Sequence, residues 1–333
     1  MFPRAIVVVV PQGSNAVSGG NLYNKRLMDS LAKGREFRRV YVRDWMKEQP
    51  TPATYIVDTL NLAEFSELVR TRVPGQKFVL LVHHLASLEP GASDSSDGCM
   101  LETAMLPLFD GFIATSQYTA DVLAEYGLGK RIFVGEPALE EVRSPVRELS
   151  WPPRVLMASN LIPRKGVLAF LQELSGCVSA EACFSLDIVG RTDMDRGYSS
   201  ACAALVQHDA LAKRVRLLGP VGYRDMRAKF ETADLYLSSS RMETFGIALQ
   251  EARYYGLPIF AVDGGNSGRH VIPGVTGELY ETPEKLAEAF ASLVSRKNRL
   301  RRYFDKAQTG RPVATESWDE LAVRLCETIS NWC

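Results

Sequence analysis

The sequence predicts an α/β protein built from two doubly wound parallel-sheet domains. The chain has 333 residues, which suits two domains of roughly 100–200 residues each. Short apolar runs alternate with amphipathic helical stretches along most of it, as is typical of parallel sheets covered by helices. A charged stretch with three prolines at 140–153 interrupts this alternation and is predicted to be a linker. We therefore expect domains at 1–148 and 149–315, with a cleft between them.

The first domain is expected to contain strands at 5–10, 39–42, 55–57, 78–82, 111–114 and 132–134. The apolar run at 5–10 is too short to span a membrane, which takes about 20 residues, so it predicts a buried strand. Segments 21–32 and 117–126 have helical periodicity. Thr115 and Ser116 form a capping signal before the second of these helices.

The second domain is expected to contain strands at 155–158, 184–189, 215–218, 235–238 and 258–261, each followed by a helix or a loop. Ligands of such sheets bind beyond the carboxyl ends of the strands, where loops and helix N-termini collect. Glycines and charged residues are concentrated in these loops. The functional residues are therefore expected there.

Composition argues against several classes of protein. Acidic and basic side chains balance to a formal net charge of +0, which removes the long-range field on which nucleic-acid binding relies. The six cysteines include no C-x-x-C pair and no metal-ligand spacing, so free thiols in a reducing cytosol are expected. We expect a cytoplasmic protein that binds neither nucleic acid nor a metal.

One local exception to the charge balance is a basic run of Lys33, Arg35, Arg38, Arg39 and Arg43. Such a run either faces water or contacts anionic lipid headgroups. The second interpretation would place the protein peripherally at the inner face of the membrane, and both stay open at this point.

The most informative segment carries two glutamates, Glu243 and Glu251, eight residues apart. A strand end leads into a loop with Glu243, Gly246 lets the backbone approach closely, and a helix then carries Glu251. At ~1.5 Å per helical residue their separation is at most ~12 Å, comparable to the distance between the hexose and the ribose of an extended nucleotide sugar. The helix N-terminus between them suits a diphosphate. A surface helix with two solvated glutamates is the alternative interpretation.

A second group of residues follows the strand predicted at 155–158 and contains Asn160, Arg164, Lys165 and Gly166. Fixed cations in a cleft stabilise the charge that grows on a leaving diphosphate. Lys165 and Arg164 are therefore candidates for holding that group. For Arg164, a solvated loop residue remains the alternative.

With these motifs the sequence resembles the family-4 retaining glycosyltransferases, which have the GT-B fold of two Rossmann-like domains facing a cleft. Glu243 and Glu251 match the family's E-x7-E motif, and the loop with Lys165 resembles its G-R-L-x3-K-G motif. The resemblance implies that Glu243 contacts the transferred sugar, Glu251 the ribose and Lys165 the phosphates. Asn160 stands where the family has an arginine, and we infer that Arg164 compensates for the missing charge.

The same resemblance points to loops of the first domain. Gly19 and Gly20 open a helix where family members place a glycine pair that meets the diphosphate and the acceptor. His83 and His84 follow the strand at 78–82, where members often carry a histidine that faces the donor sugar. His83 is favoured by its position and His84 stays open, while a purely structural role remains the alternative for at least one of them.

Three further features follow from the resemblance. The loop 219–222 corresponds to the loop whose backbone meets the nucleobase, which brings Val221 into the expected site. In the glycine-rich stretch 264–269, Arg269 stands where the family usually has a glutamate. The C-terminal helix, within 316–333, is expected to pack back on the first domain.

The predicted catalytic residues are Glu243, Lys165, Arg164, His83 and His84. The predicted donor-binding residues are Gly19, Gly20, Asn160, Arg164, Lys165, Val221, Glu243, Thr244, Phe245, Gly246, Ile247 and Glu251.

The resulting hypothesis is a metal-independent glycosyltransferase, expected to be a hexosyltransferase. It would move a sugar from a nucleotide-diphosphate sugar, with UDP or GDP as the expected nucleotide, to an unidentified glycan, lipid or small molecule. The nucleotide sugar is a co-substrate, so no bound cofactor is expected. Retention, and a departing phosphate that accepts the acceptor's proton, are implied by the resemblance alone. A nucleotide-sugar epimerase and a non-catalytic relative that binds a nucleotide sugar or a protein partner are the alternatives, the latter suggested by Asn160 and Arg269.

Overall fold

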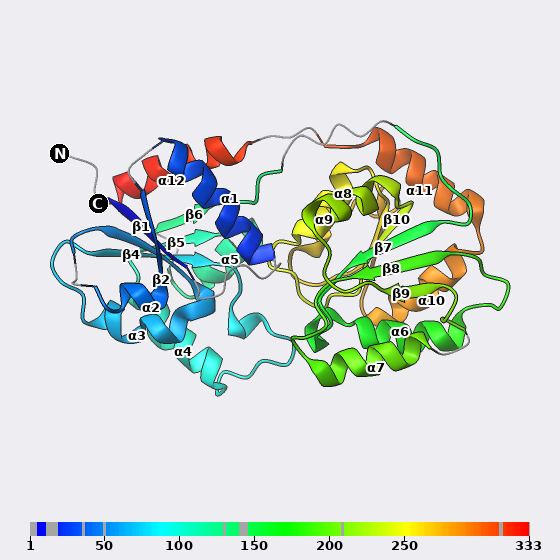
Figure 1. Cartoon of the computed structure of the whole chain (residues 1–333), viewed down its shortest axis with the longest axis horizontal. Helices are drawn as coiled ribbons and strands as arrows, with labels where there is room; N and C mark the ends of the chain where they lie inside the picture. Colours follow the sequence, from blue (N-terminus) through cyan, green and yellow to red (C-terminus); the bar gives the residue numbers. More distant parts are fainter. Residues whose placement is uncertain are drawn as a thin grey trace. The chain divides into compact units, whose positions relative to one another are not determined.

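The computed structural model describes residues 5–10, 19–34, 37–48, 51–128, 131–139, 146–207, 210–312 and 316–332. The chain divides into two compact units, one made of Met1–Glu140 and Ala314–Cys333 and the other of Glu141–Val313. We call them unit 1 and unit 2. Each contains a six-stranded sheet with helices packed against it (Figure 1). The predicted α/β class with two parallel-sheet domains is therefore confirmed.

The sheet of unit 1 has the strand order β2-β1-β3-β4-β5-β6, and all neighbouring strands are parallel. Its strands are β1 (Ile6–Val10), β2 (Phe37–Tyr41), β3 (Thr54–Asp58), β4 (Lys77–Val82), β5 (Gly111–Ala114) and β6 (Ile132–Val134). The prediction for the second strand, 39–42, was wrong at its end. Val42 begins the short helix α2 (Val42–Trp45), and this turn buries Trp45 beside Tyr55 and Phe65.

Both faces of this sheet are covered, so its strands are apolar on both sides. Along β1, Val7 and Val9 pack on one face, whereas Ile6, Val8 and Val10 pack on the other. On the first face lie α2, α3 (Leu62–Arg70), α4 (Asp97–Met105) and α5 (Gln117–Glu125). On the second lie α1 (Gly19–Gly34) and α12 (Trp318–Asn331).

Serine side chains cap the N-termini of α5 and α12, and the cap of α5 was predicted. The hydroxyl of Ser116 accepts a hydrogen bond from Thr119 N at 3.0 Å, so the expected cap of α5 is confirmed. Ser317 and Glu320 form a capping box at the start of α12. This C-terminal helix packs against α1, so it lies within unit 1.

The sheet of unit 2 has the order β12-β11-β10-β7-β8-β9 and is also parallel throughout. Its strands are β7 (Arg154–Ala158), β8 (Ser185–Val189), β9 (Val215–Leu217), β10 (Leu235–Ser238), β11 (Ile259–Val262) and β12 (Gly277–Tyr280). The strand β12 was not among the ranges predicted from apolar runs. It is a short edge strand in which Glu278, Leu279 and Tyr280 are partly exposed, so it lacks the continuous buried apolar run of strands such as β11.

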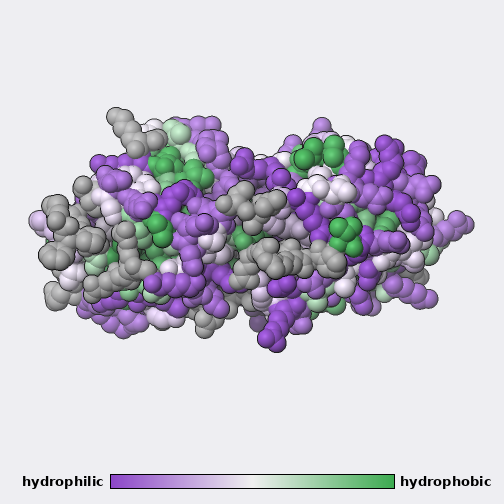
Figure 2. Space-filling model, turned by 90° about the horizontal axis from the view of Figure 1, so that it is seen from above, coloured by the Kyte–Doolittle hydropathy of each residue, from purple (hydrophilic) through white to green (hydrophobic). Residues whose placement is uncertain are grey.

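Helices cover both faces of this second sheet as well. One face carries α6 (Val167–Cys177), α7 (Arg196–Val206), α10 (Pro283–Leu293) and α11 (Lys297–Thr309). The other face carries α8 (Tyr223–Thr232) and α9 (Ile247–Tyr254). In the view of Figure 2, hydrophobic residues appear as separate small patches among hydrophilic ones. None of the helices in the described ranges is long and apolar enough to cross a membrane.

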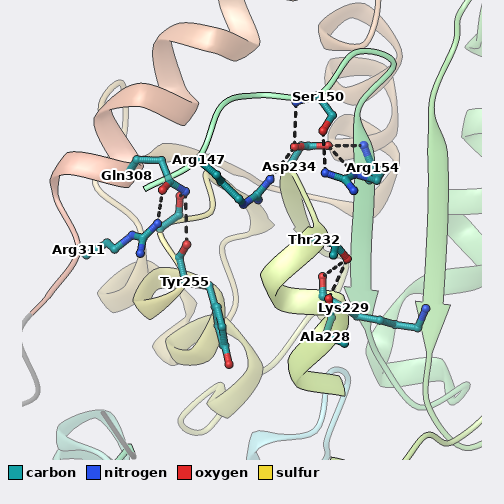
Figure 3. A network of polar contacts seen from close by, with 11 residues as sticks. Arg147, Ser150, Arg154, Ala228, Lys229, Thr232, Asp234, Tyr255, Gln308 and Arg311 are labelled. Carbon is teal, nitrogen blue, oxygen red and sulfur yellow. Dashed lines mark hydrogen bonds and ion pairs between the residues drawn. The ribbon is translucent and has the colours of Figure 1, made fainter. Parts of the chain in front are cut away.

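The described part of the expected linker, residues 146–153, is hydrogen-bonded to the buried carboxylate of Asp234 in unit 2 (Figure 3). Arg147 Nη1 donates to Asp234 Oδ1 at 2.9 Å, and Ser150 N donates to the same oxygen at 3.1 Å. The other oxygen accepts from Arg154 N at 2.8 Å. Residues 140–145 of that linker lie outside the described part of the chain. From residue 146 onward, the segment belongs to unit 2.

Candidate functional site

The loop between β10 and α9 carries Glu243, and its course is set by a second loop rich in glycine. Glu243 N donates to Gly264 O at 3.2 Å, and Asn266 N donates to Glu243 O at 2.7 Å. Gly265 has φ +59°, and a Cβ atom there would lie only 2.4 Å from Glu243 O. Only glycine permits this close approach, because any side chain would push the loop with Glu243 away.

A third loop, after β7, presents Lys165 to this position. Ser239 Oγ donates to Lys165 O at 2.7 Å, and Arg241 N donates to Arg164 O at 3.0 Å. Gly166 has φ +64°, and a Cβ atom there would lie 2.3 Å from Ser239 O. Because β7 and β10 are neighbours in a parallel sheet, their carboxyl ends meet at one edge, and these backbone contacts lock the two loops together.

The result is an ion pair between two of the predicted site residues. Lys165 Nζ lies 2.5 Å from Glu243 Oε1, and the two side chains are only 16% and 17% exposed. Arg164 approaches from the same loop and donates from Nη1 to Met242 O at 2.9 Å. The structure thus brings Glu243, Lys165 and Arg164 together.

Electrostatics keep the carboxyl group of Glu243 ionised. Burial by itself would raise the pKa of Glu243, but the charge and hydrogen bond of Lys165 together with the charge of Arg164 outweigh it, and the pKa lies below its usual value. The site therefore holds a charged pair in a largely buried place, where an approaching anion interacts strongly with the lysine.

Glu251 lies on α9, the helix that follows the loop of Glu243. Burial raises the pKa of the Tyr236 hydroxyl, and the charges of Glu243 and Glu251 both raise it further, so both carboxylates lie within electrostatic range of that hydroxyl. The N-cap of α9 is Gly246, in the left-handed conformation with φ +87° and with no side-chain cap. The first-turn N–H groups of α9 thus start beside Glu243, as an anion site at a helix N-terminus requires.

The predicted donor residues next to Gly246 divide into two kinds. Phe245 is buried, and its carbonyl oxygen accepts from Asn266 Nδ2 at 2.9 Å, so its side chain belongs to the interior. Thr244 and Ile247 are partly exposed. Thr244 and Ile247 therefore have side-chain surface available to a ligand, whereas Phe245 does not.

His270 is a residue that the sequence reasoning missed. Its ring is buried, and its Nε2 lies 2.6 Å from Phe245 O, an acceptor, so this nitrogen carries the proton. Burial lowers the pKa of His270 to about 4. The ring also packs 3.5 Å from the Cβ position of Gly246, so His270 supports the loop that starts α9. The neighbouring Arg269, which the sequence singled out, is exposed.

The side chain of Asn160, the residue that departs from the family pattern, forms a hydrogen bond within unit 2. Its Oδ1 accepts from Arg191 N at 2.9 Å, and Leu161 N donates to Arg191 O at 2.9 Å. These contacts join the loops after β7 and β8.

Val221 is partly buried and lies in the loop after the edge strand β9. Glu243 follows β10, and the strands β7 and β8 lie between β9 and β10 in the sheet.

In unit 1, His83 and His84 follow β4 but have different surroundings. His83 is 9% exposed and lies in a polar cluster, whereas His84 Nε2 lies 2.7 Å from Glu89 Oε1 nearer the surface. Gly19 and Gly20 begin α1, and the Cβ position of Gly20 is 3.3 Å from the His83 ring. Residues 11–18, which precede these glycines, lie outside the described residues. The structure therefore brings Gly20 to His83 and not to His84.

No group of three or more His, Cys, Asp or Glu side chains placed to hold a metal ion is found among the residues that the structure describes.

Comparison with known proteins identifies related sequences. Residues 140–311, just over half of the chain, match the family described as glycosyl transferases group 1. The phosphatidyl-myo-inositol mannosyltransferase of Mycobacterium leprae is 31% identical over 173 residues, which is 51% of this chain and 44% of that protein. The D-inositol 3-phosphate glycosyltransferase of Nocardia farcinica is 32% identical over 122 residues, 36% of this chain and 27% of that protein. The chain thus spans less than half the length of these curated relatives.

Solved structures share the fold over nearly the whole chain. Sucrose-phosphate synthase from Thermosynechococcus elongatus superposes with a TM-score of 0.77 at 18% identity, covering 98% of each chain. Anabaena HepE, crystallised with UDP-glucose, superposes with a TM-score of 0.74 at 16% identity, covering 98% of this chain and 100% of that one. The predicted GT-B architecture, with its two Rossmann-like domains, is confirmed at the level of the fold.

Proposed function

Because the chain belongs to the glycosyl transferases group 1 family, we propose that it transfers a sugar from a nucleotide-diphosphate sugar to an acceptor nucleophile with retention of configuration. One observation carries this proposal. The Lys165–Glu243 ion pair lies beside the uncapped N-terminus of α9, at the edge of the unit 2 sheet where ligands of such folds bind.

Each group has a role that its chemistry suits. Lys165 is a cation for the diphosphate, and the first-turn N–H groups of α9 supply further donors to the same anion. Glu243 accepts hydrogen bonds from hydroxyls of the transferred sugar, and Glu251 from the ribose. Arg164 adds positive charge near the leaving group, which Asn160 does not supply. Val221 and the backbone around it contact the nucleobase.

His83 is the better candidate of the two histidines for a contact with the donor sugar. It lies against Gly20 in the first turn of α1, whereas His84 pairs with Glu89 nearer the surface. As the first two residues of α1, Gly19 and Gly20 would offer backbone N–H groups to the donor diphosphate.

The donor that we propose carries UDP or GDP, and the fold shared with HepE, which was crystallised with UDP-glucose, supports UDP. We propose a metal-independent reaction with no bound cofactor, in which cations of the chain and helix N-termini balance the diphosphate charge. The departing phosphate accepts the proton of the acceptor hydroxyl.

The acceptor that we propose is a hydroxyl compound held by the loops of unit 1. The names of the curated relatives favour an inositol-containing compound, either an inositol phosphate or a phosphatidylinositol. A peripheral position at the cytoplasmic membrane surface would suit a lipid acceptor. The basic run gives this only weak support, because Lys33 pairs with Asp319 at 3.0 Å and Arg38 pairs with Glu48.

The test is a titration of the purified protein with UDP, GDP and ADP by calorimetry and thermal unfolding. One nucleotide should bind and stabilise the wild type, and Lys165→Ala and Glu251→Ala should each weaken that binding by at least tenfold. Lys285→Ala, which removes an exposed lysine of α10, is the matched control and should bind as the wild type does.

Binding by the wild type and the control, with turnover of a nucleotide sugar in the presence of acceptor mixtures, would support transfer. Binding without any turnover would favour a non-catalytic relative. If no nucleotide binds, the proposed function is wrong.

A further inference from the structure

Three polar side chains from separate elements of unit 1 meet where β3 and β4 end. Asn24 Nδ2 lies 2.6 Å from Asp58 Oδ2, and Asn24 Oδ1 lies 2.8 Å from His83 Nε2. The same oxygen of Asp58 is 3.5 Å from His83 Nε2. Asp58 and Asn24 are only 2% and 4% exposed. None of the sequence motifs pointed to Asn24 or Asp58.

Hydrogen-bonding rules determine which atoms carry protons in this cluster. An ionised carboxylate only accepts hydrogen bonds, so the amide NH2 of Asn24 must face Asp58. The carbonyl oxygen of Asn24 then faces His83, and it too only accepts. Because both neighbours of His83 Nε2 are acceptors, the proton must be on that nitrogen.

The other oxygen of Asp58 is also held. It accepts from Leu60 N at 2.9 Å, which caps the turn after β3. Asp58 therefore has little freedom to rotate, and the direction of the Asn24 amide is set by the backbone of unit 1.

The ring of His83 is held from other sides as well. The Tyr23 ring meets it edge-on at a centroid distance of 5.3 Å, and the Cβ position of Gly20 is 3.3 Å from its Cγ and Cδ2. Tyr23 is itself fixed by donating from its hydroxyl to Gly135 O at 2.9 Å. Burial lowers the pKa of His83, and this outweighs the opposing charge of Asp58, so the ring is neutral near pH 7.

We infer that Asn24 is a positioning residue, which links the carboxylate of Asp58 to His83 and holds the imidazole as the Nε2-protonated tautomer, with Nδ1 as an acceptor for a hydroxyl of the bound sugar. The last part rests on the proposed function. The tautomer itself is a property of the free protein, since all the atoms that determine it belong to unit 1.

The first experiment needs no ligand. The full chain is labelled with ¹⁵N-histidine, and ring nitrogens are detected by long-range ¹H–¹⁵N correlation, with His83 assigned through its absence in His83→Gln. In the wild type, His83 should show a protonated, pyrrole-like Nε2 and an unprotonated, pyridine-like Nδ1. A protonated Nδ1 with a bare Nε2 would overturn the inference.

Two variants test the source of this preference. Asp58→Asn keeps the shape but lets the Asn24 amide face either way, and Asn24→Leu removes the link. Both should shift His83 toward a mixture of tautomers. Asn298→Leu, on the exposed side of α11, is the matched control and should leave the His83 spectrum unchanged. An unchanged tautomer in both test variants would overturn the role of Asn24.

The second experiment separates positioning from binding. With the nucleotide sugar and acceptor that the wild type turns over, Asn24→Leu should lower kcat by tenfold or more, while its Kd for the free nucleotide, held by unit 2, stays within twofold. If kcat and the affinity for the free nucleotide fell by the same factor, the result would contradict a positioning role. If the wild type binds no nucleotide, the proposed function fails, but the tautomer result still decides whether Asn24 orients His83.

Discussion

The ammonium group of Lys165 lies 2.5 Å from a carboxylate oxygen of Glu243, although 78 positions separate the two residues in the chain. Both side chains are largely buried, so the charge of each is balanced mainly by the other. A diphosphate that binds Lys165 must therefore compete with Glu243 for the lysine. Because of this competition, a mutation of Glu243 should affect binding of the diphosphate and transfer of the sugar in different ways.

We expect Glu243→Gln to bind the free nucleoside diphosphate more tightly, because the substitution releases Lys165 from its partner. The expected gain is on the order of tenfold, or about 1.4 kcal/mol. Transfer of the sugar should become slower, on the order of 10²-fold, because an electrostatic contact at the reacting sugar is lost. Calorimetry with UDP or GDP and initial rates with the nucleotide sugar measure the two effects.

Glu251→Gln is the control for this prediction, since its side chain is assigned to the ribose. It should weaken nucleotide binding. Weaker nucleotide binding by Glu243→Gln as well would show that the ion pair does not compete with the ligand.

Gly166→Ala should destabilise unit 2 by about 1–3 kcal/mol, because a left-handed backbone and a clash with Ser239 O oppose any side chain there. It should also weaken nucleotide binding, since the loop that carries Lys165 must move. Gly176→Ala is the control, because nothing lies within 4 Å of its Cβ position in helix α6. That substitution should stabilise by up to about 1 kcal/mol. Equal urea midpoints for the two variants would contradict the argument.

The stability of the protein should fall as the pH is lowered from about 6.5 to about 4, in part through His270. Its pKa is lowered to about 4 in the folded chain, so in this window the unfolded chain binds a proton that the folded chain does not. One such group contributes a slope of up to about 1.4 kcal/mol per pH unit. His83 acts in the same direction. Urea unfolding at several pH values should give a smaller slope for His270→Gln, and an unchanged slope would refute the assignment.

Asp234→Asn should cost about 3 kcal/mol of stability, because it leaves Arg147 without its charged partner. Asp234 precedes β10, whereas Glu243 follows that strand, so nucleotide affinity should stay the same. Asp193→Asn alters an exposed aspartate and should leave the stability nearly unchanged. A loss of affinity in Asp234→Asn without a loss of stability would contradict this separation.

Much of the fold follows from local sequence. Strands buried on both faces need continuous apolar runs, such as Ile6–Val10, and these are visible without any knowledge of their neighbours. The cap at Ser116 is equally local, because its partner Thr119 is three residues away. The prediction was wrong at Val42, where the burial of Trp45 against Tyr55 and Phe65 ends the strand early.

The sequence by itself determined the fold class, most strands and the loops that carry Glu243, Lys165 and His83, because these depend on residues close together in the chain. Only the tertiary structure decided which side chains meet. The strand order brings the loop of Lys165 to Glu243, and packing aligns Asn24 with Asp58 and His83. It also turns the Asn160 side chain toward Arg191 N. Such contacts depend on how the whole sheet packs, since residues far apart in sequence meet only when the strands between them have taken their places.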